Sequence, residues 1–146
     1  MSLENLLGIS LEKVEPDSEV IKRLLAAAER NIADSHIIEV SSENRFDAAY
    51  KAIMQLSNAA LQANGYRTLT NRPGHHMTMI QVLSQTIGLD KQIVIVLDAL
   101  RKQRNVADYS GDIVPASAVD ECVKHAENLL HVVNAWLTAN RPELLK

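Results

Sequence analysis

Hydrophobic positions along the chain recur at steps of three and four residues in five segments, which is the spacing of one face of an α-helix. These segments cover about 18–38, 43–64, 75–87, 89–109 and 115–139. The last one has the longest apolar stripe: Val119, Cys122, Val123, Ala126, Leu129, Leu130, Val133, Trp136 and Leu137. Each segment is therefore predicted to form an amphipathic helix, the third being shorter than the others.

Turn-forming residues separate these segments, so they support the predicted boundaries. Asp17 or Ser18 is expected to cap the first long helix, and Gly65 is expected to end the second. The run 93–96 is rich in β-branched residues, but no second such run exists to pair with it, so helix is favoured there. We predict an all-α fold, an antiparallel bundle of four long helices with one or two short ones.

The length of 146 residues suits one domain, spanning 1–146. Cys122 is the only cysteine, which rules out an internal disulfide and points to a core position. The longest aliphatic run covers 93–97, far below the roughly 20 residues that cross a membrane. These features predict a cytoplasmic protein without a membrane span.

Charge is distributed unevenly along the chain. The net charge of -3 argues against a protein that coats DNA or RNA, and aromatic residues, at 3%, are too few for a base-stacking platform. Residues 65–111 nevertheless carry a surplus of three positive charges, whereas the segments on either side are acidic. Any contact with nucleic acid is therefore expected to be local and electrostatic.

The segment 100–109 holds the densest set of candidate binding residues. On a helix, Arg101, Arg104, Asn105 and Asp108 follow one another at three- and four-residue steps, so their polar ends can converge. The two arginines can grip a phosphate, Asn105 can orient a sugar or base, and Asp108 can hold Arg104. Tyr109 can donate a hydrogen bond or move a proton. The alternative is a solvated helix end with an Arg104–Asp108 ion pair and a half-buried Tyr109.

A second candidate lies at 67–76, where two arginines precede His75 and His76 at the start of a predicted helix. Backbone N–H groups at a helix start, together with arginine and histidine, suit an anion. The alternative is that Thr70 or Asn71 caps this helix and that one histidine packs against a neighbour.

Other chemistry has weaker support. Glu121, Cys122 and His125 fall on adjacent turns, and Glu127 and His131 repeat a four-residue step, but no paired Glu-x-x-His pattern exists. The chain also has no glycine-rich phosphate loop and no nucleophile elbow. We expect no metal and no cofactor.

Three stretches resemble the HEPN superfamily of small helical bundles: Asn44 to Ala52, Gly74-His75-His76 with the helix that follows, and Arg101 to Tyr109. The third, in the form Arg-x-x-x-Asp-Tyr, is the most specific. The resemblance implies a homodimer in which the arginine strips of two protomers face each other across a cleft. It also implies a role in nucleotide or RNA binding, or a partner such as a nucleotidyltransferase in a toxin–antitoxin-like pair.

Active members of that superfamily cut RNA without metal, using an arginine and a histidine four to six residues after it. Arg104 matches the arginine and Asn105 the polar residue beside it, whereas Tyr109 stands in place of the histidine. A phenol with a pKa of about 10 is a poor general base near neutrality. The sequence thus favours a catalytically degenerate module that binds through Arg101, Arg104, Asn105, Asp108 and Tyr109, with His75 and His76 in the same cleft. The alternatives are a metal-independent endoribonuclease using Arg104 with Tyr109, His75 or His76, and a plain helical interaction domain.

Overall fold

The computed structural model describes residues 2–71, 73–111 and 114–146, except for the side chains of residues 108–110. The chain is mostly helical, as the sequence predicts. Its long helices are α1 (Ser18–Ser35), α2 (Ser42–Ala63), α5 (Lys91–Ser110) and α6 (Ala116–Asn140), and its short ones are α3 (His75–Gln81) and α4 (Leu83–Ile87). Two 3-10 turns, η1 (Leu3–Leu6) and η2 (Pro142–Leu145), lie near the two ends of the chain. None of the helices in the described residues has both the length and the apolar character of a membrane span.

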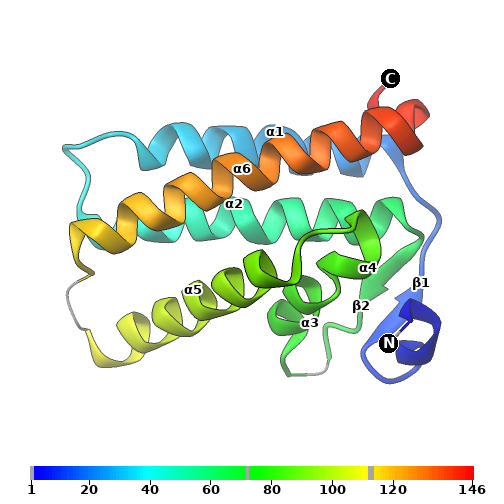
Figure 1. Cartoon of the computed structure of the whole chain (residues 1–146), viewed down its shortest axis with the longest axis horizontal. Coiled ribbons are helices and arrows are strands. Elements are labelled where there is room, and N and C mark those ends of the chain that lie inside the picture. Colours follow the sequence, from blue (N-terminus) through cyan, green and yellow to red (C-terminus); the bar gives the residue numbers. More distant parts are fainter. Residues whose placement is uncertain (1, 72, 112–113) are drawn as a thin grey trace.

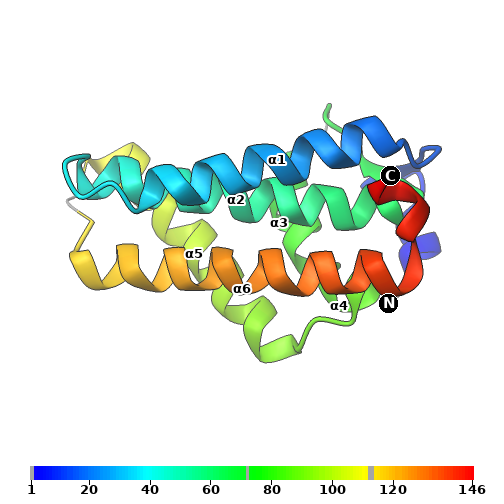
Figure 2. The same ribbon diagram turned by 90° about the horizontal axis from the view of Figure 1, so that it is seen from above.

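Helix α2 is the centre of the molecule. It packs along α1 and α6, while α5 crosses below it and α3 and α4 lie beside its C-terminal half (Figure 1; Figure 2). Twelve of the residues of α2 are buried, and many of these are alanines, which allow neighbouring helices to approach closely. What α2 leaves exposed is a narrow polar strip between α1 on one side and α3 and α5 on the other.

Side-chain caps start three of the long helices. Asp17 accepts a hydrogen bond from the Glu19 backbone N–H, which confirms one of the two predicted caps of α1. Ser41 caps α2 in the same way, and Asp90 caps α5, so each helix satisfies one of its otherwise unpaired N–H groups. The β-branched run 93–96 lies inside α5, so the preference for helix over strand there is confirmed.

The region between α2 and α5 differs from the expected single helix over 75–87. The chain leaves α-helical geometry at Val82 (φ -89°, ψ 4°), and α4 continues in a new direction after it. The residue that caps α3 is Gly74, with a φ of +81° and no side-chain hydrogen bond, so neither Thr70 nor Asn71 caps this helix.

A small antiparallel sheet is an element that the hydrophobic pattern does not predict. Strand β1 (Leu11–Lys13) pairs with β2 (Tyr66–Thr68), and Arg67 Nε donates to Glu12 Oε1 across the pair at 2.6 Å. Each strand has only three residues, too short for a periodic signal. The sheet holds the beginning of the connection that leads from α2 to α3, and so it helps to place His75 and His76.

Candidate functional site

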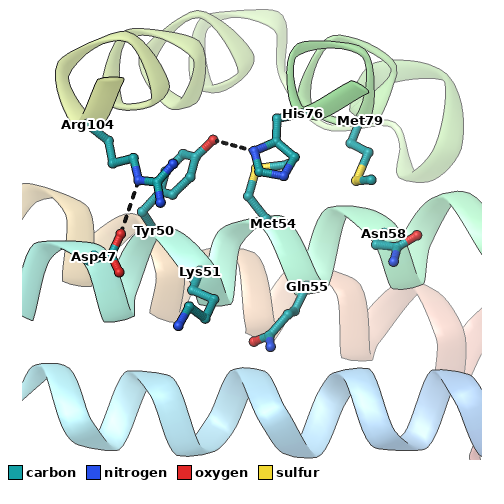
Figure 3. Close-up of a pocket in the computed structure, with 9 residues that line it drawn as sticks. All are labelled: Asp47, Tyr50, Lys51, Met54, Gln55, Asn58, His76, Met79 and Arg104. Atoms are coloured by element: carbon teal, nitrogen blue, oxygen red, sulfur yellow. Dashed lines mark hydrogen bonds and ion pairs between the residues drawn. The ribbon is translucent and has the colours of Figure 1, made fainter. Parts of the chain in front are cut away.

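A cavity of about 210 Å³ lies where α3 and α5 meet the polar strip of α2 (Figure 3). We call it the α2–α5 cleft. Its lining residues are Asp47, Tyr50, Lys51, Met54, Gln55 and Asn58 of α2, His76 and Met79 of α3, and Arg104 of α5. The cleft therefore joins the two sequence segments that were predicted to bind an anion, and α2 forms its floor.

Arg104 is held in a fixed orientation at one end of this cleft. Its Nε donates to Asp47 Oδ1 at 3.1 Å, and its Cζ lies 5.3 Å from the centre of the Tyr50 ring. Both contacts restrict the guanidinium, one through charge and the other through the face of an aromatic ring. The side chain remains 29% exposed, so a ligand can reach the guanidinium from solvent.

Tyr50 and His76 meet at the centre of the cleft, with the Tyr50 hydroxyl 3.4 Å from His76 Nδ1. Burial raises the pKa of Tyr50 to about 12, so the phenol keeps its proton at neutral pH, and the tautomer of His76 decides which of the two groups donates. The contact joins α2 to α3 across the cleft.

His76 is also surrounded by positive charge. Burial lowers its pKa first of all, and the charges of His75, Arg104 and Arg101 lower it further. The rings of His75 and His76 meet edge to face with their centres 4.6 Å apart. His76 is therefore a neutral imidazole at pH 7, able to accept or donate a hydrogen bond inside the cleft.

The floor of the cleft presents hydrogen-bond donors. Lys51, Gln55 and Asn58 follow each other at four- and three-residue steps on one face of α2. Gln55 Oε1 accepts from Asn31 Nδ2 at 2.9 Å, and Asn58 Oδ1 accepts from Gln62 Nε2 at 3.0 Å. Both amide oxygens are thus engaged, and each amide offers its N–H groups to a ligand. The cleft suits an anion, since its lining carboxylate, Asp47, is already paired with Arg104.

Of the residues predicted from sequence, Arg104 and His76 line the cleft. His75 lies beside His76, and Asn105 is half-buried on α5 without lining the cavity. Arg101 also lies outside the lining and pairs with Asp98 through a 2.8 Å hydrogen bond to Oδ1. The predicted strip on α5 is therefore divided in the structure, with Arg104 turned to the cleft and Arg101 turned to Asp98.

Two predicted site residues, Asp108 and Tyr109, have side chains outside the described part of the structure. Sequence spacing suggested Asp108 as the residue that holds Arg104. The described structure pairs Arg104 with Asp47, 57 residues earlier in the chain and on another helix, a contact that local spacing did not suggest.

Several lining residues were not predicted as site residues. The hydrophobic pattern assigned Tyr50 to the core, and it is indeed buried, with 2% of its surface exposed. Its ring and hydroxyl nevertheless contact Arg104 and His76. The signal in the sequence was the polar series of Asp47, Lys51, Gln55 and Asn58, which follow one another at helical spacing.

Within the described residues, no group of three or more histidine, cysteine, aspartate or glutamate side chains is arranged to hold a metal ion. Glu121 and His125 form a pair on α6, with Oε1 and Nε2 3.3 Å apart. Cys122 is fully buried, as predicted, and burial raises the pKa of its thiol to about 12. The thiol is therefore protonated and unreactive in the folded protein.

Comparison of the chain with protein-family models, with curated proteins and with solved structures finds no match.

Proposed function

We propose that this chain is a HEPN-like, catalytically degenerate helical module that binds the phosphate of a nucleotide or of RNA in the α2–α5 cleft. The observation that carries the proposal is Arg104, held between Asp47 and the Tyr50 ring and still open to solvent. A planar guanidinium can bind two phosphate oxygens at once, and a restrained side chain loses less conformational entropy when it binds.

The rest of the cleft supports a ligand with a phosphate and a less polar part. Lys51 adds a second cation, while Gln55 and Asn58 offer N–H donors. Met54 and Met79 supply apolar, polarisable surface for a sugar or a base. A volume of about 210 Å³ is below the roughly 300–1,000 Å³ of pockets for drug-sized ligands, so it fits one nucleotide unit better than a large cofactor.

Binding of uridine 5′-monophosphate, measured by titration calorimetry, tests this proposal. Replacing Arg104 by glutamine should weaken binding roughly ten-fold or more, since a hydrogen bond to a charged group contributes about 1.5–3 kcal/mol. The matched control is Lys91→Gln, the same loss of charge at an exposed position at the start of the same helix. Equal affinities for the parent and Arg104→Gln, or equal losses in the two variants, would show that phosphate is not bound by Arg104.

A metal-independent endoribonuclease is the second candidate, and the neutral His76 beside Arg104 is the observation that favours it. A neutral imidazole can take the proton of a ribose 2′-hydroxyl as its oxygen bonds to phosphorus and the 5′-oxygen leaves, while Arg104 stabilises the negative charge on the phosphate oxygens. The test is RNA cleavage in the presence of a chelator. Cutting that both Arg104→Gln and His76→Asn abolish would establish the enzyme, whereas binding without cutting supports the degenerate module.

The proposal includes a homodimer that uses the outer face of α5. Ile95 is 63% exposed and Val106 57% exposed, and about three turns of helix separate them on the same face. Exposed Ala99 and Lys102 lie between them on this face, so the proposed interface is a small apolar surface with one cation. Light scattering on the purified chain should give twice the monomer mass, and Val106→Glu should reduce it to that of the monomer. A partner protein such as a nucleotidyltransferase would compete with a second copy for this face.

A further inference from the structure

The α2–α5 cleft is the first of three neighbouring hollows that follow one another from α5 across α2 to α1. Lys51 and Gln55 line the cleft and also a second hollow between α1 and α2. Arg30 of α1 is part of the lining of this second hollow. Figure 3 shows both side chains reaching from α2 toward α1. A third hollow, on the outer face of α1, shares Arg30 with the second and adds Arg23. The three hollows therefore adjoin one another, and we call them together the cationic track.

The charges along this track are mostly positive. Arg104, Lys51, Arg30 and Arg23 follow one another from α5 to α1. The structure gives Lys51, Arg30 and Arg23 no ion pair with any described residue, and all three are exposed. Two carboxylates line the first two hollows, Asp47 paired with Arg104 and Asp34 in the second hollow, and the described lining of the third hollow has none. An anionic chain thus meets a cation in each hollow.

A fourth hollow shows which way such a chain would run. It also includes Lys51, but it lies toward the N-terminal end of α2 and is lined by both Asp34 and Asp47. Its lining has two carboxylates and one cation, whereas the second hollow has one carboxylate and two cations, so a phosphate is attracted more strongly toward Arg30. The track therefore has one favourable path, from Arg104 past Lys51 to Arg30 and Arg23.

We propose that the ligand is a single-stranded RNA segment of several nucleotides, with successive phosphates on Arg104, Lys51, Arg30 and Arg23, and that a free nucleotide occupies only the inner end. This inference rests on the proposed function of the cleft. The inner end has methionine walls beside N–H donors, which suits a base and its sugar better than an acidic peptide side chain. The described lining beyond His76 has no aromatic ring, so the outer track holds phosphates without reading bases.

The test compares uridine 5′-monophosphate with oligouridylates of two, four and eight nucleotides at several salt concentrations. Affinity should rise with length up to about four phosphates and then level off, because the track has four cations. The logarithm of the binding constant should fall with the logarithm of salt concentration by about 0.7 for each phosphate contact. Steeper salt dependence for the longer strands is therefore expected.

Arg30→Gln and Arg23→Gln should each weaken binding of the tetranucleotide roughly five-fold and reduce its salt slope by about 0.7, with the monophosphate bound as before. Lys124→Gln is the matched control, an equal loss of charge at an exposed position on α6. Arg23, Arg30 and Lys124 are all exposed, so these variants are expected to fold like the parent.

The outcomes separate the track from the cleft. A tetranucleotide that binds no tighter than the monophosphate, or that is unaffected by Arg30→Gln, would overturn the track and leave the cleft in place. Monophosphate binding that Arg104→Gln leaves unchanged would instead contradict the proposed function. Tighter binding of hexaglutamate than of the tetranucleotide would assign the track to an acidic peptide and overturn the RNA proposal.

Discussion

Helices α5 and α6 are both long and both pack on α2, but they do so by different means. Helix α6 buries an apolar stripe of seven residues, among them Leu129 and Val133. In α5 the buried residues of the described part are Leu97 and Leu100, and Arg104 makes polar contact with α2. Helix α6 thus stabilises the fold by burying apolar side chains, whereas α5 also places the charged side chain of Arg104 against α2.

This difference has a physical basis. A phosphate site needs cations near solvent, and apolar burial excludes solvent. Along the cleft, α5 and α2 therefore meet through an ion pair and an aromatic ring, contacts that stabilise less than a packed core does. The apolar residues that α5 leaves exposed, Ile95 and Val106, are the ones proposed to meet a second copy of the chain.

The largest expected effect lies on the α6 side. Leu129 is 1% exposed, and Leu129→Ala should lower the free energy of unfolding by about 3 kcal/mol, through lost burial and the cavity left behind. Urea unfolding followed by circular dichroism measures it. Gln103→Ala, at an exposed position on α5, is the control and should change stability by no more than about 0.5 kcal/mol. Equal decreases in the free energy of unfolding at the two positions would contradict the proposed difference between α5 and α6.

Much of the fold could be predicted because a helix that packs on one face has apolar residues at steps of three and four in its sequence. The stripe that begins at Val119 and ends at Leu137 is buried at seven of its predicted positions. The sheet of β1 and β2 leaves no such record, since its two short strands lie more than 50 residues apart in the chain. The break of the third predicted helix at Val82 is also not visible in the apolar spacing, which continues through it.

The candidate site could be predicted only in part, for a related reason. Charge and spacing within single segments identified Arg104 and His76. They could not show that Asp47 pairs with Arg104, because that contact depends on how α2 and α5 pack. Local spacing offers Arg104 only partners on its own helix, such as Asp108 four residues later. Likewise, the contact of Tyr50 with His76 depends on the path of the connection between α2 and α3.

A smaller effect is expected from breaking the ion pair between α5 and α2. Asp47→Asn should lower the free energy of unfolding by no more than about 1 kcal/mol, because both side chains are partly exposed. The same change should strengthen binding of uridine 5′-monophosphate, since it removes a negative charge beside the phosphate while the Tyr50 ring still orients Arg104. Urea unfolding and titration calorimetry measure the two effects.

Asp98→Asn is the control for that experiment, because Asp98 carries the same charge, pairs with Arg101 and lies outside the cleft lining. It should leave the affinity unchanged. If Asp47→Asn instead weakened binding as much as Arg104→Gln, the ion pair would be essential for orienting the guanidinium, and the aromatic contact alone would be insufficient.

The smallest expected effect is a pH dependence that belongs to the cleft and not to α6. The pKa of His76 is lower in the folded chain than in the unfolded chain, so the unfolded state binds the proton more readily. The stability that neutral His76 allows is complete above the ordinary histidine pKa of about 6.5 and is lost as pH falls through the lowered value. Urea unfolding between pH 7.5 and pH 5 measures this loss.

His76→Gln should flatten that part of the stability curve, whereas His131→Gln, at an exposed position on α6, should leave it as in the parent. A protonated His76 also adds a positive charge next to Arg104 and attracts the anion, whereas acidification lowers the charge of the phosphate itself, whose second pKa is about 6. As the pH falls, binding of uridine 5′-monophosphate should therefore weaken less in the parent than in His76→Gln. If the affinity had the same pH dependence in His76→Gln as in the parent, His76 would not face the bound phosphate, and the site would be confined to Arg104 and Lys51.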